Sequence, residues 1–153
     1  MTQLDGTATQ VAQPRGLANR RDVRYYPVVP SRFSAVLRHA AAVLIGYLLF
    51  AVPTAALFAF SHRDPHVAQD AAFVVFAVVY GVLAAMLAGY VAAMIGPYRS
   101  VAPARTLSLA IAAVAIVSML ARPGGGAVWS QLAAVFVLAP SALVGGWLRS
   151  LKR

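Results

Sequence analysis

Residues 71–97 read AAFVVFAVVYGVLAAMLAGYVAAMIGP, and this stretch decides the fold. Residues 71–95 contain no charged side chain. Because a helix rises about 1.5 Å per residue, this segment can cross the roughly 30 Å of hydrocarbon in a bilayer. Gly96 and Pro97 form a typical helix stop. We therefore predict a transmembrane helix over residues 71–95.

Small and large side chains of this predicted helix separate onto two faces when successive residues are placed about 100° apart. Glycine and alanine fill one half, and bulky residues such as Leu87 fill the other. Gly81, Ala85, Gly89 and Ala93 recur at every fourth position on the small face. This spacing lets two membrane helices approach until their backbones touch. We call these four the helix-packing residues and predict that their face is buried.

Three more apolar segments complete the predicted fold. The predicted helices span about 34–60, 71–95, 106–121 and 128–148. The third is near the lower length limit for spanning, and the arginines on either side of it can extend to the headgroups. The sequence therefore predicts an all-α protein, a four-transmembrane-helix bundle over residues 32–153.

The first 31 residues differ from the rest of the chain. They are polar, lack apolar periodicity and cannot bury enough surface to offset the entropy of ordering them. We predict a disordered cytoplasmic tail over residues 1–31. The apolar core of a cleaved signal peptide should begin within about the first twenty residues. Here the apolar run begins near Ala40, so we expect the first helix to be retained.

The composition agrees with placement in lipid. The chain has 153 residues, of which 61% are apolar and 11% are charged, whereas soluble domains average about 45–50% apolar. Its formal charge is +9, but the 13 positive residues flank the apolar segments and are not interleaved with aromatics. The predicted partner is therefore the lipid bilayer and not nucleic acid. Cysteine is absent, which excludes disulfides and thiolate metal sites.

The positive residues also predict the orientation, because Lys and Arg are retained on the cytoplasmic side of a membrane. Eleven of them lie in the tail, at the start of the first helix, in the second loop and at the C-terminus. Arg63 and Arg122 alone lie in the first and third loops. Both termini are therefore predicted to be cytoplasmic.

The apolar cores of the four segments contain no Asp, Glu, Lys, Arg or His. Proton-coupled carriers and pumps need such groups within the membrane, and catalysis needs a tuned acid, base or nucleophile. Small four-helix multidrug exporters, for example, rely on a carboxylate in their first helix. We therefore predict a protein that is not an enzyme, with no catalytic or cofactor-binding residues.

Mild polar side chains do remain inside the apolar segments. They are Tyr47, Thr54, Tyr80, Tyr90, Ser108, Ser118, Gln131 and Ser141. Most residues of this kind bond their own backbone or a neighbouring helix. If Tyr47, Thr54, Ser108, Ser118 and Gln131 instead converge on one cavity, they would indicate a small-molecule pathway.

The first loop contains His62, Asp64, His66 and Asp70, which are possible ligands of a divalent metal. We favour a solvated turn. Asp-Pro commonly opens a turn, and an aspartate just before a helix complements the helix dipole. We therefore predict that Asp70 lies at the N-terminus of the second helix and that the loop binds no metal.

Residues 89–99 read GYVAAMIGPYR and close the second predicted helix before a basic loop, and residues 145–149 read GGWLR and end the last. These stretches resemble segments of small bacterial four-helix integral membrane proteins. The resemblance covers about the last two thirds of the chain and implies a bacterial inner-membrane location with no established activity. The chain departs from the pattern at Met94, where those proteins often have Arg.

Three functional hypotheses follow, and the least favoured of them is a membrane enzyme that uses the first-loop histidines. The first is a structural or accessory membrane component that packs as a homo-oligomer or with a larger membrane protein, because the helix-packing residues offer close contacts without internal chemistry. The second is an oligomeric passive small-molecule pathway or transporter-like protein, which needs polar side chains around one axis.

Overall fold

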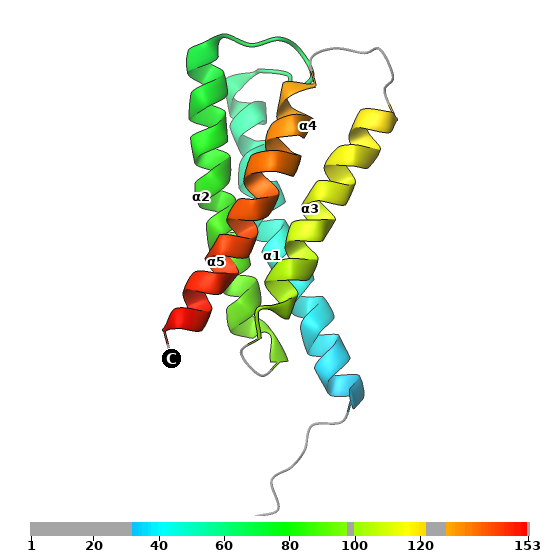
Figure 1. The fold of residues 1–153 in the computed structure, drawn as a ribbon. Coiled ribbons are helices and arrows are strands. Elements are labelled where there is room, and N and C mark those ends of the chain that lie inside the picture. The colour runs from blue at the N-terminus through cyan, green and yellow to red at the C-terminus, as the bar shows by residue number, and fades with distance from the viewer. Residues whose placement is uncertain (1–31, 98–99, 122–127, 153) are drawn as a thin grey trace, which may run out of the picture.

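The computed structural model describes residues 32–97, 100–121 and 128–152, and this part of the chain is all-helical. Four helices are long and apolar enough to cross a membrane. The elements are α1 (Arg32–Ser61), α2 (Ala71–Ile95), α3 (Ala102–Leu120), and a last helix made of α4 (Trp129–Ala133), η2 (Ala134–Leu138) and α5 (Ala139–Leu151) (Figure 1). The predicted four-helix membrane bundle is therefore confirmed. The predicted tail, residues 1–31, lies outside the described residues.

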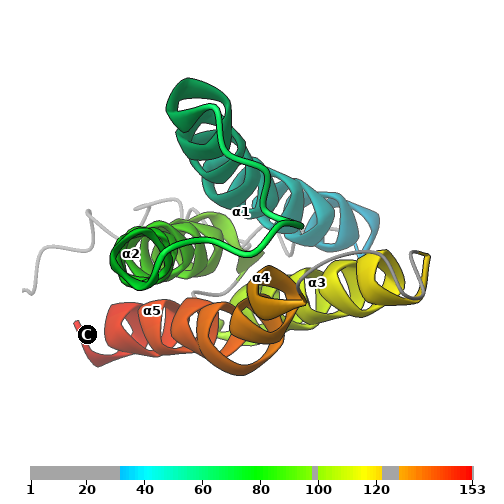
Figure 2. The same ribbon diagram turned by 90° about the horizontal axis from the view of Figure 1, so that it is seen from above.

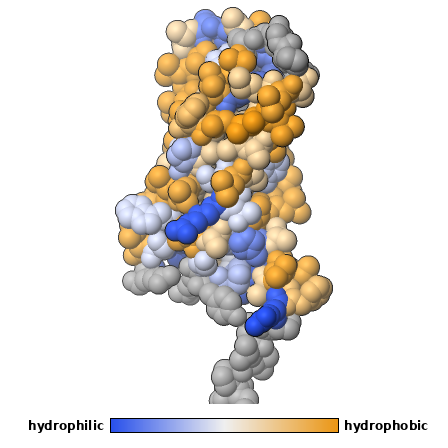
Figure 3. All heavy atoms as spheres, turned by 45° about the vertical axis from the view of Figure 1, so that its right-hand side comes forward, coloured by the Kyte–Doolittle hydropathy of each residue, from blue (hydrophilic) through white to orange (hydrophobic). Residues whose placement is uncertain are grey.

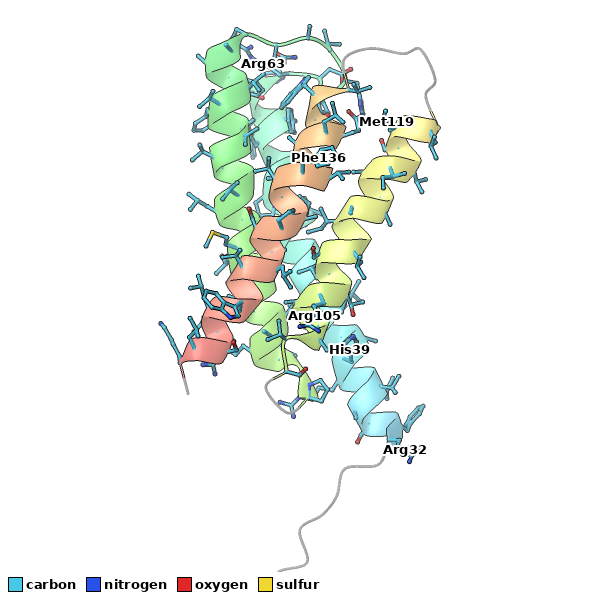
Figure 4. All side chains as sticks on the ribbon, in the orientation of Figure 1. Arg32, His39, Arg63, Arg105, Met119 and Phe136 are labelled. Atoms are coloured by element: carbon cyan, nitrogen blue, oxygen red, sulfur yellow. The ribbon has the colours of Figure 1, made fainter. Side chains whose placement is uncertain are left out.

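The bundle has two polar ends. The loop end, at the top of Figure 1, holds the first loop (residues 62–70) and the start of α4, and the terminal end holds the start of α1 and the end of α5. Figure 4 shows Arg63 at the loop end and Arg32, His39 and Arg105 toward the terminal end. Hydrophobic residues dominate the half of the face in Figure 3 that lies toward the loop end, and the other half is mixed. Positive residues near the ends of long apolar helices are typical of proteins whose helices cross a membrane.

The start of α3 differs from the prediction. The helix begins at Ala102, four residues before the predicted start at Thr106. Pro103 is tolerated in the first turn because the N–H groups there have no partner within the helix. The Ser100 Oγ accepts a hydrogen bond of 3.0 Å from the Ala102 N–H. Arg105 therefore lies inside the helix and not before it.

The last helix contains a π segment that the sequence did not predict. Within η2 the turn widens, and the Ala139 N–H bonds the Ala134 carbonyl five residues back. Pro140 follows at once. A proline ring clashes with the carbonyl four residues before it, and a wider turn gives that ring room. The helix also continues to Leu151, three residues beyond the predicted end.

The four helices pack around a core of small residues. α2 packs against both α1 and α5, and α3 packs against α5 and α1. Viewed from above, α2 lies between α1 and α5, while the loop ends of α1 and α3 diverge (Figure 2). The core consists of Ala85, Ala88, Ala92, Leu107, Ile111, Leu138, Ala139 and Ala142. Because most of these are alanines, the helix axes can come close together.

Candidate functional site

The structure places the helix-packing residues in the interior of the bundle. Gly81, Ala85, Gly89 and Ala93 are all buried. The opposite face of α2 is open, with Leu83 63% exposed and its neighbours along that face similar. A membrane helix with this division presents its large side chains to lipid and its small ones to other helices.

The contact between α2 and α5 is made by backbone. A Cβ placed on Gly89 would lie 1.8 Å from the Ala142 carbonyl oxygen, and one placed on Gly145 would lie 1.9 Å from the Met86 carbonyl oxygen. No real Cβ tolerates such distances. Each helix therefore supplies a glycine where the backbone of the other passes.

Neighbouring glycines continue this contact to the other two helices. A Cβ on Gly146 would lie 2.2 Å from the Ala104 Cβ of α3. A Cβ on Gly46 of α1 would lie 2.9 Å from Leu107 Cδ2 and 3.0 Å from the Ala92 Cβ. The small face of α2 is thus covered by helices of its own chain.

Sequence reasoning found one side of this contact and missed the other. Gly145 and Gly146 entered only through the resemblance to bacterial membrane proteins, and Gly46 was not singled out. The missed signal is the same four-residue spacing in the last helix, where Ser141 precedes Gly145 and Ala142 precedes Gly146.

A cavity of about 350 Å³ lies among the four helices in the half of the bundle toward the loop end. On α1 its lining runs from Tyr47 to Phe58, which corresponds to about 16 Å of helix. The opposite wall includes Ile111 on α3 and Leu138 on η2. Its volume is at the lower end of the roughly 300–1,000 Å³ usual for ligand pockets. The cavity is therefore narrow and elongated along the bundle.

Four of the five polar residues considered for a pathway line this one cavity: Tyr47, Thr54, Ser118 and Gln131. Ser108 does not, because its hydroxyl donates to the Ala139 carbonyl at 2.7 Å. The Thr54 hydroxyl donates to the Phe50 carbonyl of its own helix at 2.7 Å.

The other polar residues predicted inside the segments lie elsewhere. Ser141 donates to the Val137 carbonyl of its own helix at 2.7 Å. The Tyr90 ring lies under Arg149 and Lys152 near the terminal end. These contacts are structural and leave the cavity as the site where polar groups gather.

The first loop covers the cavity at the loop end. The His66 Nδ1 accepts a hydrogen bond from the Gln131 amide nitrogen when the imidazole carries its proton on Nε2, and the two atoms are 2.9 Å apart. The Ser130 Oγ lies 2.8 Å from the Pro65 carbonyl oxygen, and the Trp129 Nε1 donates to the Val67 carbonyl at 3.2 Å. We call these contacts between the loop and α4 the latch. They join residues more than 60 positions apart in the chain.

The first-loop residues considered as metal ligands go to different partners. The Asp64 carboxylate accepts from the His66 N–H at 2.8 Å, as in an aspartate turn, while the His66 ring bonds Gln131. Asp70 pairs with Arg63. Within the part of the chain that the structure describes, no three His, Cys, Asp or Glu side chains are grouped for a metal ion.

Asp70 is the N-cap of α2, as predicted. Its carboxylate accepts a hydrogen bond of 2.8 Å from the Phe73 N–H. That bond, together with the Arg63 guanidinium, holds the pKa of Asp70 below its ordinary value. Arg63 also lies over the Phe73 ring, 4.6 Å from its centroid. The loop end is thus fixed to α2 as well as to α4.

The half of the bundle toward the terminal end has a different construction. Leu107 and Pro103 are fully buried, and the Gly46 backbone lies against Leu107. At the surface, the Arg38 Nε donates to the Ile95 carbonyl at the end of α2 at 2.7 Å. A guanidinium at this position complements the negative end of the helix dipole.

Fold and site together define a four-helix membrane bundle that is close-packed in one half and hollow in the other. No family model, curated protein or solved structure matches the chain. The resemblance to small bacterial membrane proteins therefore rests on the two quoted stretches and stays a prediction.

Proposed function

We propose that this protein is a small multi-pass membrane protein that binds a small molecule in the cavity between its four helices. One observation carries the proposal: Tyr47 and Thr54 of α1, Ser118 of α3 and Gln131 of α4 line the same cavity. Most polar residues in membrane helices bond their own backbone or a neighbouring helix. Thr54 and Gln131 follow this rule here, but the Tyr47 and Ser118 hydroxyls have no hydrogen-bond partner among the described residues. The convergence of these side chains on one cavity from three helices favours a binding site.

Binding accounts for the cavity better than a pore does. A passive pathway needs a polar route through the whole bundle. The cavity ends at Ile111 of α3, and beyond it the Gly46 backbone packs against Leu107, which belongs to the buried core. The described lining also contains no Asp, Glu, Lys or Arg. We therefore propose a binding role without catalysis.

The first of the sequence-based hypotheses, a structural or accessory component, drew on the helix-packing residues for its close contacts. Gly89 and Ala93 are covered by helices of the same chain. A homo-oligomer or a larger partner would therefore have to contact another face. The purification experiment described at the end of this subsection distinguishes the accessory role from the binding of a small molecule.

The proposed location is the inner membrane of a bacterium, with both termini cytoplasmic. The excess of positive residues at the terminal end supports this orientation. Because the chain lacks cysteine, single cysteines replacing Val67 and Lys152 can report it. In intact cells, a membrane-impermeant thiol reagent should label the cysteine at position 67 and not the one at 152. The reverse pattern would invert the orientation.

The binding proposal is tested by identifying the small molecules that co-purify with the protein. The wild type and two variants are isolated in mild detergent, and their organic extracts are compared by mass spectrometry. Ala51→Phe fills the cavity lining, whereas Val52→Phe adds the same ring on the adjacent, 60% exposed position outside the lining. We expect a small molecule that accompanies the wild type and Val52→Phe but not Ala51→Phe.

Identical extracts from all three proteins would contradict a binding role. A partner protein that co-purifies equally with all three would, together with identical extracts, favour the accessory role. Thermal melting of each variant establishes that it is folded before the extracts are compared.

A further inference from the structure

We propose that the ligand of the cavity is a membrane-soluble amphiphile, a single apolar chain with an uncharged hydrogen-bonding head, which enters from the bilayer between α1 and α3. This inference rests on the proposed binding function and assigns the chemical class of the ligand. It follows from which sides of the cavity are closed, which side is open, and where the polar groups lie.

The open side faces lipid. Among the described lining residues only Ala55 on α1 and Val114 on α3 are exposed, Val114 by 51%. We call these two residues the mouth. Both are apolar and lie within helices apolar enough to span the membrane. The loop ends of α1 and α3 diverge in the same region (Figure 2). A molecule passing the mouth therefore comes from hydrocarbon.

The side toward the loop end is closed by the latch. Gln131 is only 8% exposed although it lies in the first turns of the last helix. Its amide nitrogen lies 2.9 Å from the His66 Nδ1, and its amide oxygen lies 3.0 Å from the Ser130 Oγ. Trp129 and Pro65 complete this cover. A water-soluble molecule would have to break several of these hydrogen bonds to reach the cavity.

The side toward the terminal end is closed by packing. Ile111 and Leu138 form the deep end of the cavity and belong to the buried core. Beyond them the Gly46 backbone meets Leu107, which has no exposed surface. The cavity therefore ends inside the bundle.

The polar groups are unevenly distributed along the cavity. His66, Ser118, Ser130 and Gln131 lie toward the loop end, whereas the deep end is formed by apolar side chains apart from Tyr47. An amphiphile in this cavity would place its head near Ser118 and its chain toward Ile111. The cavity extends about 16 Å along α1, and this length suits an extended chain better than a compact ring system.

The head is uncharged because no Asp, Glu, Lys or Arg is among the described residues that line the cavity. Arg63, the described cation at the loop end, is paired with the Asp70 carboxylate and also donates to Gln69. Burying an unpaired carboxylate or ammonium would be costly. A hydroxyl or carbonyl head needs only neutral partners, and near the loop end the Ser118 hydroxyl has no hydrogen-bond partner among the described residues.

The test uses the full chain in liposomes and three photoreactive probes that carry a diazirine. One is a long-chain alcohol, one is the matching carboxylic acid at pH 8, and one is a short water-soluble diol. After illumination, the labelled residues are mapped by mass spectrometry. We expect the alcohol to label the lining of α1 and α3 in the wild type and in Val52→Phe.

Ala51→Phe should reduce this labelling about tenfold, because the added ring occupies part of the cavity that the ligand needs. Ala55→Phe, which narrows the mouth without entering the core, should slow the labelling of the lining by the alcohol. It serves as the second variant if Ala51→Phe melts at a much lower temperature than the wild type.

The outcomes separate this inference from the binding function. Labelling of the lining by the diol but not the alcohol would leave the binding function standing and overturn access from lipid. Equal labelling by the acid and the alcohol would overturn the uncharged head. If no probe labelled the lining in a way that Ala51→Phe reduces, both the inference and the binding function would fail.

Discussion

The two halves of the bundle use the same helices in opposite ways. Toward the terminal end, the α2 and α5 backbones touch at Gly89 and Gly145. Toward the loop end, the same α2 borders a cavity with Ala77, Val78 and Gly81. α2 has small residues in both halves. The two halves therefore differ in the residues that pack against the small residues of α2.

Close contact needs small residues on both helices. Gly89 faces the backbone of Ala142, so nothing separates the two helices. Gly81 faces the Leu138 side chain, whose Cδ2 would lie 3.0 Å from a Cβ on that glycine. A large residue opposite a small one holds the helices apart. Together with the divergence of α1 and α3, this leaves room for the cavity.

The largest expected effect is on the close-packed half. Gly89→Leu should reduce the free energy of unfolding by about 3 kcal/mol, the upper end of overpacking costs, because the new side chain meets backbone that cannot move aside. Leu87→Ala is the control, since Leu87 is 56% exposed on the lipid-facing side. Thermal melting in detergent measures both. A larger loss from Leu87→Ala would mean that the faces of α2 are assigned backwards.

A milder pair of substitutions compares the halves directly. Gly145→Ala should cost about 2 kcal/mol because its Cβ would meet the Met86 carbonyl oxygen. Gly81→Ala should cost less than about 1 kcal/mol, because the terminal methyl group of Leu138 can shift toward the cavity. Melting temperatures of the two variants test this order. Equal losses would show that the hollow half is as tightly constrained as the other.

The latch should contribute a smaller effect. Gln131→Leu keeps the side-chain size but removes the bond to the His66 Nδ1, and we expect a loss of about 1 kcal/mol. Hydrogen exchange of the first-loop amides should speed up, while exchange in α2 and α5 stays slow. Leu132→Ala, on the adjacent 43% exposed position, is the control. Unchanged loop exchange in Gln131→Leu would argue against a latch.

The smallest effect is expected at Asp70. Its folded-state pKa is lowered by the Phe73 N–H and Arg63, so the carboxylate adds stability above its unfolded pKa. That contribution is lost as the pH falls through the folded-state pKa, below about pH 4. The melting temperatures of the wild type and Asp70→Asn should therefore differ slightly at neutral pH and converge in acid. A difference that does not shrink as the pH falls below about 4 would point to another cause.

Much of the fold was predictable because it depends on local properties. The range of α2, residues 71–95, follows from an uncharged run that ends at Gly96 and Pro97. The cap at Asp70 follows from a side chain adjacent to its own helix. The start of α3 was wrong because Arg105 was taken as a boundary, although a long arginine at the membrane surface can belong to a helix. The π segment before Pro140 was not expected because it depends on local crowding.

The site was predictable only in part. The sequence analysis singled out four of the polar residues that line the cavity. It could not decide whether their side chains meet in one cavity or lie apart in the bundle. Ser108 shows why: its position on α3 is similar to that of a lining residue, yet its hydroxyl meets the Ala139 carbonyl. The sequence shows how residues are arranged around their own helix, but it does not show how that helix is rotated relative to its neighbours.

The sequence by itself determined the number of membrane helices, their approximate limits and the small face of α2, because apolar length and residue spacing are properties of contiguous chain. Only the tertiary structure decided what covers that face and where the cavity lies. The contact of Gly89 with Ala142 and the bond of His66 to Gln131 join residues more than 50 positions apart. Such contacts depend on how whole helices tilt and turn against one another, and no local pattern specifies that geometry.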